Sequence, residues 1–193
     1  VVEDALFAAR PAIEPIGLNS MKAAHVTAAD FRMQGGAAAS VIGVIPGKII
    51  TEHLRLELPV RAGERQIDLD QDVAKVAVGA RHGVNRNIGL GFVKGFGLRR
   101  GAIASSVGHD SHNICVVGAD DADMAAAVNR LGAIRGGFVV VSDGEVQAEL
   151  ALPVAGLMSD RPVEAVRDGL GPLRAAAQAL GATRGEPFLQ GAF

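Results

Sequence analysis

The sequence predicts an α+β domain in which helices cover a mixed or antiparallel β-sheet. Most of the apolar segments of strand length come before the first segment with helical periodicity. The last two strand segments are joined by Asp143-Gly144, a dipeptide that favours a type I′ hairpin turn and therefore antiparallel pairing. Strands that are grouped together, with helices coming later, indicate an α+β domain.

The composition is that of a globular domain. The chain has 193 residues, of which 49% are hydrophobic and 25 are Gly, and it lacks Trp and Tyr. This length suffices for one domain with its own core and a connecting segment. The formal net charge is −2, with 19 Lys and Arg against 21 Asp and Glu. We therefore expect no nucleic-acid partner, because such proteins usually carry a basic surface.

Cysteine use and hydropathy bear on where the protein is located. Cys115 is the only cysteine, so the chain has no internal disulfide, and a reducing compartment is favoured. Its position in an apolar run predicts a small, buried side chain. We find no apolar run of membrane-spanning length and no signal segment, and we expect a cytoplasmic protein without membrane contact. The chain starts at Val1 and stops at Phe193, so we expect a piece of a longer protein that continues at both ends.

The first sixty residues predict a linker, one helical turn and a strand. Residues 1–20 contain Pro11 and Pro15 and no sustained period, which indicates a linker or edge segment from a preceding domain. We expect the domain itself to cover residues 21–193. Thr27 and Asp30 form a helix-start pattern, but the glycines at 35 and 36 limit it to a single turn. Residues 49–58 alternate apolar and polar side chains, as in a half-buried strand.

Three further strands and a helix are predicted in the middle of the chain. Residues 72–83 predict a strand, and residues 101–107 and 113–119 are almost wholly apolar, which is typical of strands covered on both faces. Asp120 is expected to cap a helix that ends near Gly132.

The last sixty residues predict a hairpin and a helix. Two β-rich runs flank Asp143-Gly144, and apolar residues then recur at helical spacing from 163 to 180. Gly169, Gly171 and Pro172 are expected to kink or divide this final helix, because proline removes a backbone donor and glycine weakens helices.

The glycine-rich run GLGFVKGFG at 89–97 matches neither nucleotide-binding fingerprint. We expect its glycines to let the backbone bend tightly or approach a neighbour closely. Ser105 and Ser106 precede His109, but the chain lacks the GxSxG elbow, so a serine hydrolase is not indicated.

The densest polar chemistry is the run GHDSHN at 108–113, between two apolar strands. His109, Asp110 and His112 could meet at one spot, because a turn can direct both imidazoles and the carboxylate to the same side. Imidazole and carboxylate together provide either a divalent metal site or an acid/base pair near neutral pH. Asn113 could bind the edge of a heterocycle. The alternative is that these residues only satisfy backbone groups at the strand ends.

A second polar group ends another predicted strand. Arg81 and His82 come at its end, and Asn85, Arg86, Asn87 and Lys94 are expected in the loop that follows. If this strand neighbours the 101–107 strand, the two polar groups converge. The alternative is an ordinary solvated loop.

Three runs carry a resemblance to a known family. They are HGVNRNIGLGFVKGFGLRRGAIASSVGHDSHNICVVGADDADMAAAVNRL at 82–131, GGFVVVSDGEVQAELALPVAGLMSD at 136–160 and VIGVIPGKIITEH at 41–53. From about residue 20 to its end, the chain resembles the C-terminal domain of the bacterial adenine deaminases of the amidohydrolase superfamily. The resemblance implies a metal-dependent enzyme of purine metabolism that converts adenine and water to hypoxanthine and ammonia, with manganese or iron bound in a (β/α)8 barrel.

The sequence lacks the paired HxH and the later metal ligands of that barrel. We therefore expect no metal ligand here and no activity from the isolated segment, which would pack on the barrel and help to enclose adenine. The expected catalytic contributors are His109, Asp110 and His112, and the expected substrate contacts are Arg81, His82 and Asn113. Two alternatives stay open: a structural domain that makes interdomain or homo-oligomer contacts, and an accessory metal site at His82, His109 and His112.

Overall fold

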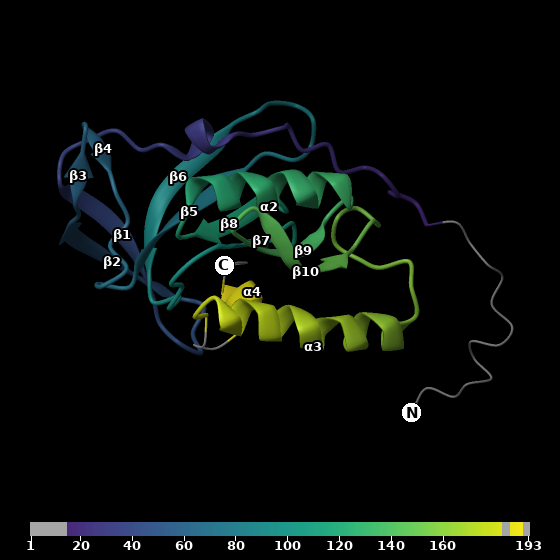
Figure 1. The fold of residues 1–193 in the computed structure, drawn as a ribbon. Helices are drawn as coiled ribbons and strands as arrows, with labels where there is room; N and C mark the ends of the chain where they lie inside the picture. The colour runs from purple at the N-terminus through teal and green to yellow at the C-terminus, as the bar shows by residue number, and fades with distance from the viewer. Residues whose placement is uncertain (1–14, 183–185, 191–193) are drawn as a thin grey trace, which may run out of the picture.

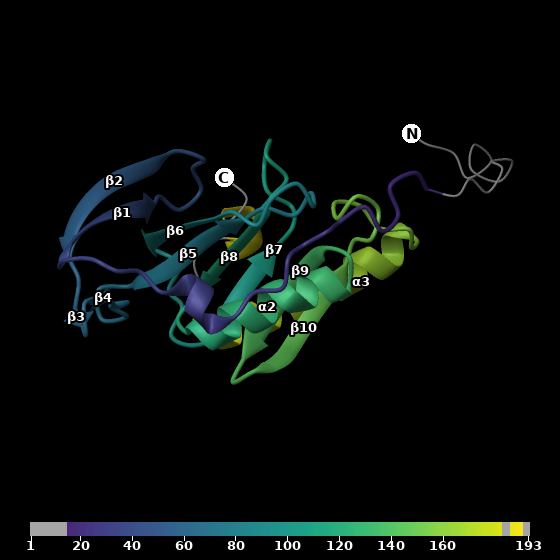
Figure 2. The same ribbon diagram turned by 90° about the horizontal axis from the view of Figure 1, so that it is seen from above.

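The computed structural model describes residues 15–182 and 186–190, which form three layers (Figure 1). A long β-sheet is the middle layer. Helix α2 (Asp121–Ala133) covers one face of it, and helix α3 (Val163–Ala179) covers the other. The predicted sheet, mostly antiparallel and covered by helices, is confirmed. Seen from above, β1 and β2 extend beyond both helices (Figure 2).

The sheet has eight strands in the order β10-β9-β7-β8-β5-β6-β1-β2. They are β1 (Ala38–Val44), β2 (Thr51–Glu57), β5 (Val73–Gly79), β6 (Ile88–Lys94), β7 (Ala102–Ser105), β8 (Ile114–Gly118), β9 (Gly137–Ser142) and β10 (Glu145–Ala151). Every neighbouring pair is antiparallel except β1 and β6, which are parallel. The short strands β3 (Val60–Arg61) and β4 (Glu64–Arg65) form a separate hairpin. The four predicted strands at 49–58, 72–83, 101–107 and 113–119 correspond to β2, β5, β7 and β8.

The central strands are buried on both faces, as their continuous apolar runs predicted. Along β9, Val139 and Val141 belong to the core under α2, whereas Val140 belongs to the core under α3. Strand β7 alternates in the same way, with Ala104 toward α2 and Ile103 toward α3. Because side chains alternate along a strand, a strand between two helices needs apolar residues at every position.

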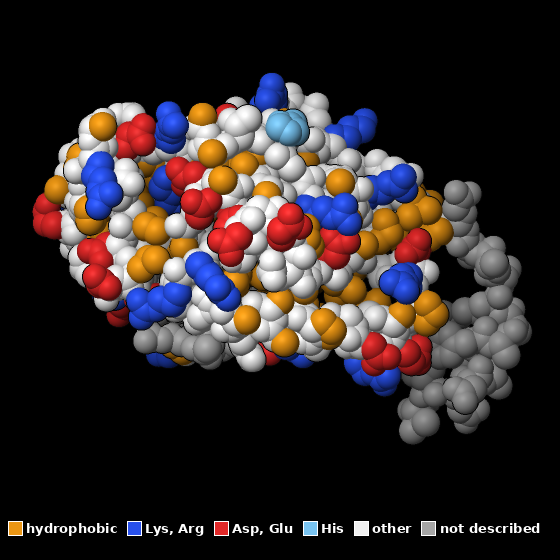
Figure 3. Space-filling model, viewed as in Figure 1, with side chains coloured by type: hydrophobic (Ala, Val, Ile, Leu, Met, Phe, Trp, Pro, Cys, Tyr) orange, Lys and Arg blue, Asp and Glu red, His pale blue; other side chains and the backbone are white. Residues whose placement is uncertain are grey.

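Helix α2 begins as predicted. The Asp120 carboxylate accepts hydrogen bonds from the backbone N–H groups of Ala122 at 2.8 Å and Asp123 at 2.9 Å. These bonds satisfy two of the donors that a helix start leaves unpaired. The helix ends at Ala133, next to the predicted end at Gly132. On the face seen in Figure 3, acidic and basic side chains are interspersed.

The predicted hairpin is also confirmed. Asp143 and Gly144 both have positive φ, 57° and 78°, as a type I′ turn requires, and they join β9 to β10. The turn contacts α2, because the Asp123 carboxylate accepts from the N–H groups of Asp143 at 3.1 Å and Gly144 at 2.7 Å. A buried carboxylate on the helix therefore fixes the position of the hairpin.

Helix α3 is one helix rather than two. It runs from Val163 to Ala179 with Pro172 inside it, so the predicted division is wrong. Leu173 and Ala177 are buried against the sheet, and this packing outweighs the missing proline donor. Gly169 has a packing role, because a Cβ there would lie 2.9 Å from a methyl group of Leu150 on β10.

Two strands of the large sheet, β1 and β6, were not predicted, nor was the short hairpin of β3 and β4. The glycines at 89–97 were predicted to let the backbone bend, but most of this run forms β6. Lys94 belongs to this strand rather than to a loop. The prediction that the glycines of this run approach a neighbouring segment closely is confirmed at the end of the run. Gly95 and Gly97 have positive φ, and a Cβ at Gly97 would lie 2.8 Å from the carbonyl oxygen of Gly181.

The N-terminal part agrees with the predictions where it is described. A single 3-10 turn, η1 (Ala28–Phe31), follows Thr27, whose N–H donates to the Asp30 carboxylate at 2.7 Å. Leu18 makes an isolated antiparallel bridge to Val154, so the described chain enters beside the end of β10. The predicted linker lies largely outside the described residues. Among the described residues, no helix is long and apolar enough to cross a membrane.

Candidate functional site

The 108–113 loop connects β7 to β8, which are antiparallel neighbours. Two of its non-glycine residues, Asp110 and His112, have positive φ, 58° and 48°. The turn is closed by backbone hydrogen bonds from Ser111 to His109 and from His112 to Gly108. Left-handed backbone at non-glycine residues is uncommon and persists only where surrounding contacts hold it.

Arg81 supplies the main contact to this loop. Its side chain is buried, Nε donates to the carbonyl oxygen of His112, and Nη1 donates to that of Ala155 at 2.8 Å. Burial lowers the pKa of Arg81 from its ordinary value, but an arginine keeps its charge throughout the physiological range. The guanidinium therefore joins the 108–113 loop to the segment after β10.

His82 lies beside Arg81 and contacts the same loop. Its Nε2 lies 3.3 Å from the carbonyl oxygen of Ser111. The two polar groups thus converge, and they do so because β5 pairs with β8: Gly79 lies opposite Ile114. The prediction gave a different reason for this convergence, because it assumed that the strand before Arg81 would neighbour the 101–107 strand. That strand, β7, pairs with β8 and β9.

The side chains of the loop are directed to solvent. His109 Nδ1 lies 3.2 Å from Asp110 Oδ1, and the two side chains are 58% and 91% exposed. His112 is exposed, and Asn113 is half-buried. The backbone of the loop is thus bound to the domain, while an imidazole–carboxylate pair remains at its surface.

Next to the loop lies an open hollow of about 230 Å³ on the α3 side of the sheet. His109, Ser111 and Asn113 border it, and its floor is apolar. Cys115 lines this floor, and burial raises the pKa of its thiol to about 11, so the thiol is protonated at neutral pH and is a poor nucleophile. Cys115 is half-buried rather than fully buried as predicted, and its place in the floor agrees with the expected role as a small apolar side chain.

A second hollow adjoins the loop and has a mixed polar and apolar lining. Its volume is about 430 Å³, and it is lined by His82, Asn85, Asn87, Ser111 and Asn113 among others. The two hollows share Val78, Ser111 and Asn113, so they adjoin each other at the loop and at the end of β5.

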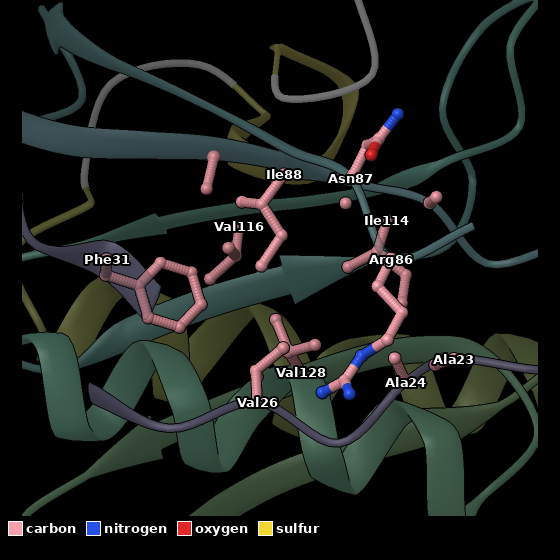
Figure 4. A pocket seen from close by; sticks show the side chains of 13 residues that line it. Ala23, Ala24, Val26, Phe31, Arg86, Asn87, Ile88, Ile114, Val116 and Val128 are labelled. Atoms are coloured by element: carbon pink, nitrogen blue, oxygen red, sulfur yellow. The ribbon is translucent and has the colours of Figure 1, made fainter. Parts of the chain in front are cut away.

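A third cavity is small, about 20 Å³, and lies between η1, α2 and the sheet (Figure 4). Phe31, Ile88 and Val128 point into it, and Arg86 extends along it toward the 23–26 segment. Arg86 Nη2 donates to the carbonyl oxygen of His25 at 3.1 Å. The space suffices for one water, so this cavity is a packing feature, and Arg86 is a contact between segments rather than a purely solvated loop residue.

Ser106, near His109 in sequence, is structural. It is fully buried; its Oγ donates to the carbonyl oxygen of Gly156 at 2.6 Å and accepts from the N–H of Gly137 at 2.7 Å. Both of its hydrogen-bonding roles are satisfied by backbone. A buried hydroxyl needs hydrogen-bond partners, and these two bonds supply them. This structural role of Ser106 agrees with the absence of a hydrolase motif.

The described residues do not form a metal centre. Nowhere in residues 15–182 and 186–190 do three His, Cys, Asp or Glu side chains come together so that they could share a metal ion. The divalent metal that the resemblance implies for the whole enzyme therefore does not fit the groups that this part of the chain provides.

Sequence reasoning missed the apolar side of the site. Ile42 and Val44 of β1 line the open hollow beside the loop, although they lie more than sixty positions earlier in the chain. The alternation from Ala38 to Val44, with Ala39 and Val41 buried and Ile42 exposed, was the available signal for a strand with one open face.

Comparison with known proteins agrees with the resemblance. The adenine deaminase C-terminal domain family matches residues 48–193. Adenine deaminases of Methylobacterium nodulans, Rhizobium meliloti and Brucella abortus are 68%, 64% and 58% identical over the whole chain. The chain spans about a third of these curated relatives, covering 34%, 34% and 33% of their lengths. The chain belongs to the adenine deaminase C-terminal domain family.

Proposed function

We propose that this chain is the C-terminal domain of a cytoplasmic adenine deaminase, which hydrolyses adenine to hypoxanthine and ammonia. The relatives named adenine deaminase and the match to the C-terminal domain family support this assignment. A preceding (β/α)8 barrel binds the divalent metal, manganese or iron, and that metal supplies the activated water when bound. This chain contributes from outside the metal centre.

The contribution of this chain is the 108–113 loop, which borders the substrate at the mouth of the barrel. One observation carries this proposal: Arg81 and His82 bind the backbone of the loop, and the His109–Asp110 pair is left exposed. A loop whose backbone is held in an unusual conformation, with its acid and base groups facing outward, is typical of a binding loop.

The residues have separate roles in this proposal. His109, oriented by Asp110, and His112 exchange hydrogen bonds or a proton with the ring nitrogens of adenine, because an imidazole beside a carboxylate can do both near neutral pH. Asn113 offers an amide donor and acceptor to the heterocycle edge. Arg81 and His82 act as positioning residues, since their described contacts go to the loop backbone.

The test uses the full-length enzyme. We expect His109→Ala and His112→Ala each to reduce kcat/KM on adenine at least about tenfold, since a general acid/base group typically contributes 10²–10⁴-fold. His25→Ala is the matched control, because His25 is also exposed but lies on the α2 side. Thermal unfolding should be unchanged in all three. Wild-type kinetics in both loop variants would exclude the loop from the site.

A structural role is the second candidate function. It is favoured by large apolar side chains that are half exposed in strands, such as Ile42 at 45% and Val78 at 42%. In this case the domain makes interdomain or homo-oligomer contacts and adds no group to the reaction. Light scattering of the full-length enzyme carrying Val78→Asp would show whether such contacts join subunits, because loss of an oligomer with unchanged loop chemistry would favour this role.

A further inference from the structure

The α3 side of the sheet is only partly covered by α3. Helix α3 contacts β9 and β10, and the strands toward the other edge, β5, β6 and β1, extend past it (Figures 1 and 2). On this uncovered part, Val78 lies opposite Gly89, Val76 lies opposite Gly91, and the exposed Ile42 lies opposite Val93, which is buried. We call this surface, formed by Ile42, Val76, Val78, Gly89 and Gly91, the open face.

The open face is apolar and hollowed. Together with the 108–113 loop, its valines and isoleucine line most of the hollow of about 230 Å³. Ile42 and Val78 are 45% and 42% exposed, whereas the same kind of residue is fully buried where the helix covers the sheet. An apolar surface of this kind, with a polar loop at its rim, marks a site of contact with another protein surface.

The two glycines of the open face are not explained by this chain. Neither Gly89 nor Gly91 has a positive φ. A Cβ at Gly91 would make only an ordinary contact, 3.5 Å from Val76 Cγ1, and at Gly89 the nearest atom would be 3.9 Å away. Glycine within a strand destabilises it relative to alanine, because glycine loses more backbone freedom on folding. It recurs where another backbone or a ligand approaches closely, and an approaching surface would explain both positions.

We propose that the open face is the docking surface for the part of the polypeptide that precedes this domain. The relatives are about three times as long as this chain, since it covers 34% of their length, so a body about twice the size of this domain has to pack somewhere. This inference rests on the proposed function, because it takes the missing part to be the rest of an adenine deaminase.

The entry point of the chain is compatible with this surface. The described chain enters beside β10, and β6 lies five strands away in the sheet, a separation of roughly 24 Å at about 4.8 Å per strand. A compact body twice the size of this domain has a radius of gyration of about 21 Å, so it can span this distance. Docking here also brings the preceding part against the 108–113 loop, because that loop borders the same hollow.

Site-specific photo-crosslinking in the full-length enzyme tests the proposal. Val78 is replaced by benzoylphenylalanine, the protein is irradiated, and the adduct is located by mass spectrometry. Val146 on β10 is the matched control, since it is also a strand valine and is 41% exposed. We expect Val78 to crosslink to residues preceding this domain in the same molecule, at a yield at least about fivefold above that of Val146. Ile42 serves as a second position in case the Val78 variant does not fold.

Every other result overturns the proposal. An adduct between two copies, identified by mixing isotopically light and heavy protein, would assign the face to an oligomer. An adduct to residues after Gln190 would assign it to the C-terminal end of the chain, and equal low yields at all positions would leave the face in solvent. Adenine turnover by the same preparation before irradiation is measured separately, so a failed function assignment is distinguishable from a failed docking surface.

Discussion

Arg81 is the residue on which the conformation of the 108–113 loop depends. Its guanidinium is buried and donates to backbone carbonyls of two segments that are distant in sequence, at His112 and Ala155. The sequence singled out Arg81 as a polar strand end and assigned it to substrate, an assignment that stays a prediction. Its contacts could not be predicted, because they depend on which strand lies beside β5.

Removing Arg81 should loosen the loop and lower stability. We expect Arg81→Met to reduce the free energy of unfolding by about 2–3 kcal/mol, because the hydrogen bonds it removes involve a charged donor and leave buried carbonyls unpaired. Urea unfolding measures the loss, and faster hydrogen exchange at the amide of His112 would report the loosened loop. Arg61→Met, at an exposed position of the β3–β4 hairpin, is the control. Equal stability of the two variants would contradict the role given to Arg81.

Lys75 is the second buried cation, and it links three elements. Its Nζ lies 2.6 and 2.8 Å from the two carboxylate oxygens of Asp121 and donates to the carbonyl oxygen of Phe31 at 2.9 Å. The Lys75 side chain is 9% exposed and that of Asp121 is 28% exposed. Water can hydrate the aspartate more readily than the lysine, so the charge of the lysine relies more on its partner. The pair joins β5 to the start of α2 and to η1.

Removing Asp121 should destabilise the domain more than removing Lys75. We expect Asp121→Ala to destabilise the domain by about 2 kcal/mol or more, because it leaves a buried ammonium without its counter-charge. Lys75→Met should cost less, since the remaining carboxylate can be hydrated and the methionine fills the same space. A double-mutant cycle by urea unfolding measures both effects and their coupling. A larger loss from Lys75→Met would show that the energetic dependence is reversed.

At the scale of elements, predictions succeeded where the signal was local. The α2 cap needs only Asp120 and the residues that follow it, and the hairpin needs only Asp143-Gly144, so neighbouring residues suffice for both. Strand β6 was missed because its local composition, with glycines at alternate positions, disfavours a strand. Pairing with β5 and β1 on its two sides overrides that propensity. Helix α3 likewise runs through Pro172 because its packing on the sheet is a tertiary effect.

One ion pair connects α2 to β10 and should make the stability of the fold depend on pH. Arg130 on α2 donates through Nε and Nη2 to the two carboxylate oxygens of Glu149 on β10, both at 2.6 Å. These hydrogen bonds hold the pKa of Glu149 below its ordinary value of 4.5. A carboxyl group whose pKa is lower in the folded state stabilises the fold above the unfolded pKa, and this contribution is lost as the pH falls through the folded pKa.

Glu149→Gln should therefore matter most near neutral pH. We expect the variant to be less stable than the wild type by up to about 1 kcal/mol at pH 7, because the pair is partly exposed. The difference should shrink steadily below about pH 4.5 as the wild-type carboxylate becomes protonated. Urea unfolding across this range measures it, with Glu145→Gln, exposed on the same strand, as the control. A difference that is constant with pH would show that the ion pair contributes nothing.

At the scale of the whole molecule, the domain provides a loop and a surface but no metal centre among its described residues. The barrel implied by the resemblance and the open face lead to the same expectation, namely that this domain acts only together with the preceding part. The strand order places the loop and the open face side by side. The loop joins β7 to β8, and β8 is the neighbour of β5, which carries the valines of the open face.

The isolated 193-residue chain should fold but not turn over adenine. Apolar cores under α2 and α3 support folding, and its described residues do not form the metal centre that activates water. Circular dichroism would report the folded state, and an ammonia-release assay with added Mn²⁺ or Fe²⁺ would report activity. Full-length enzyme is the positive control. Adenine turnover by the folded isolated chain would place the reaction centre within this domain.

The sequence by itself determined the local elements, the buried strands at the centre, the family and the position of the polar loop. These properties depend on residues close together along the chain or on runs of matching sequence. Only the tertiary structure decided that Arg81 binds the loop backbone, that β1 and β6 extend the sheet, and that an apolar face beside the loop remains uncovered. Each of these depends on strand pairing between distant segments, such as β1 with β6, and pairing energy is not contained in either segment alone.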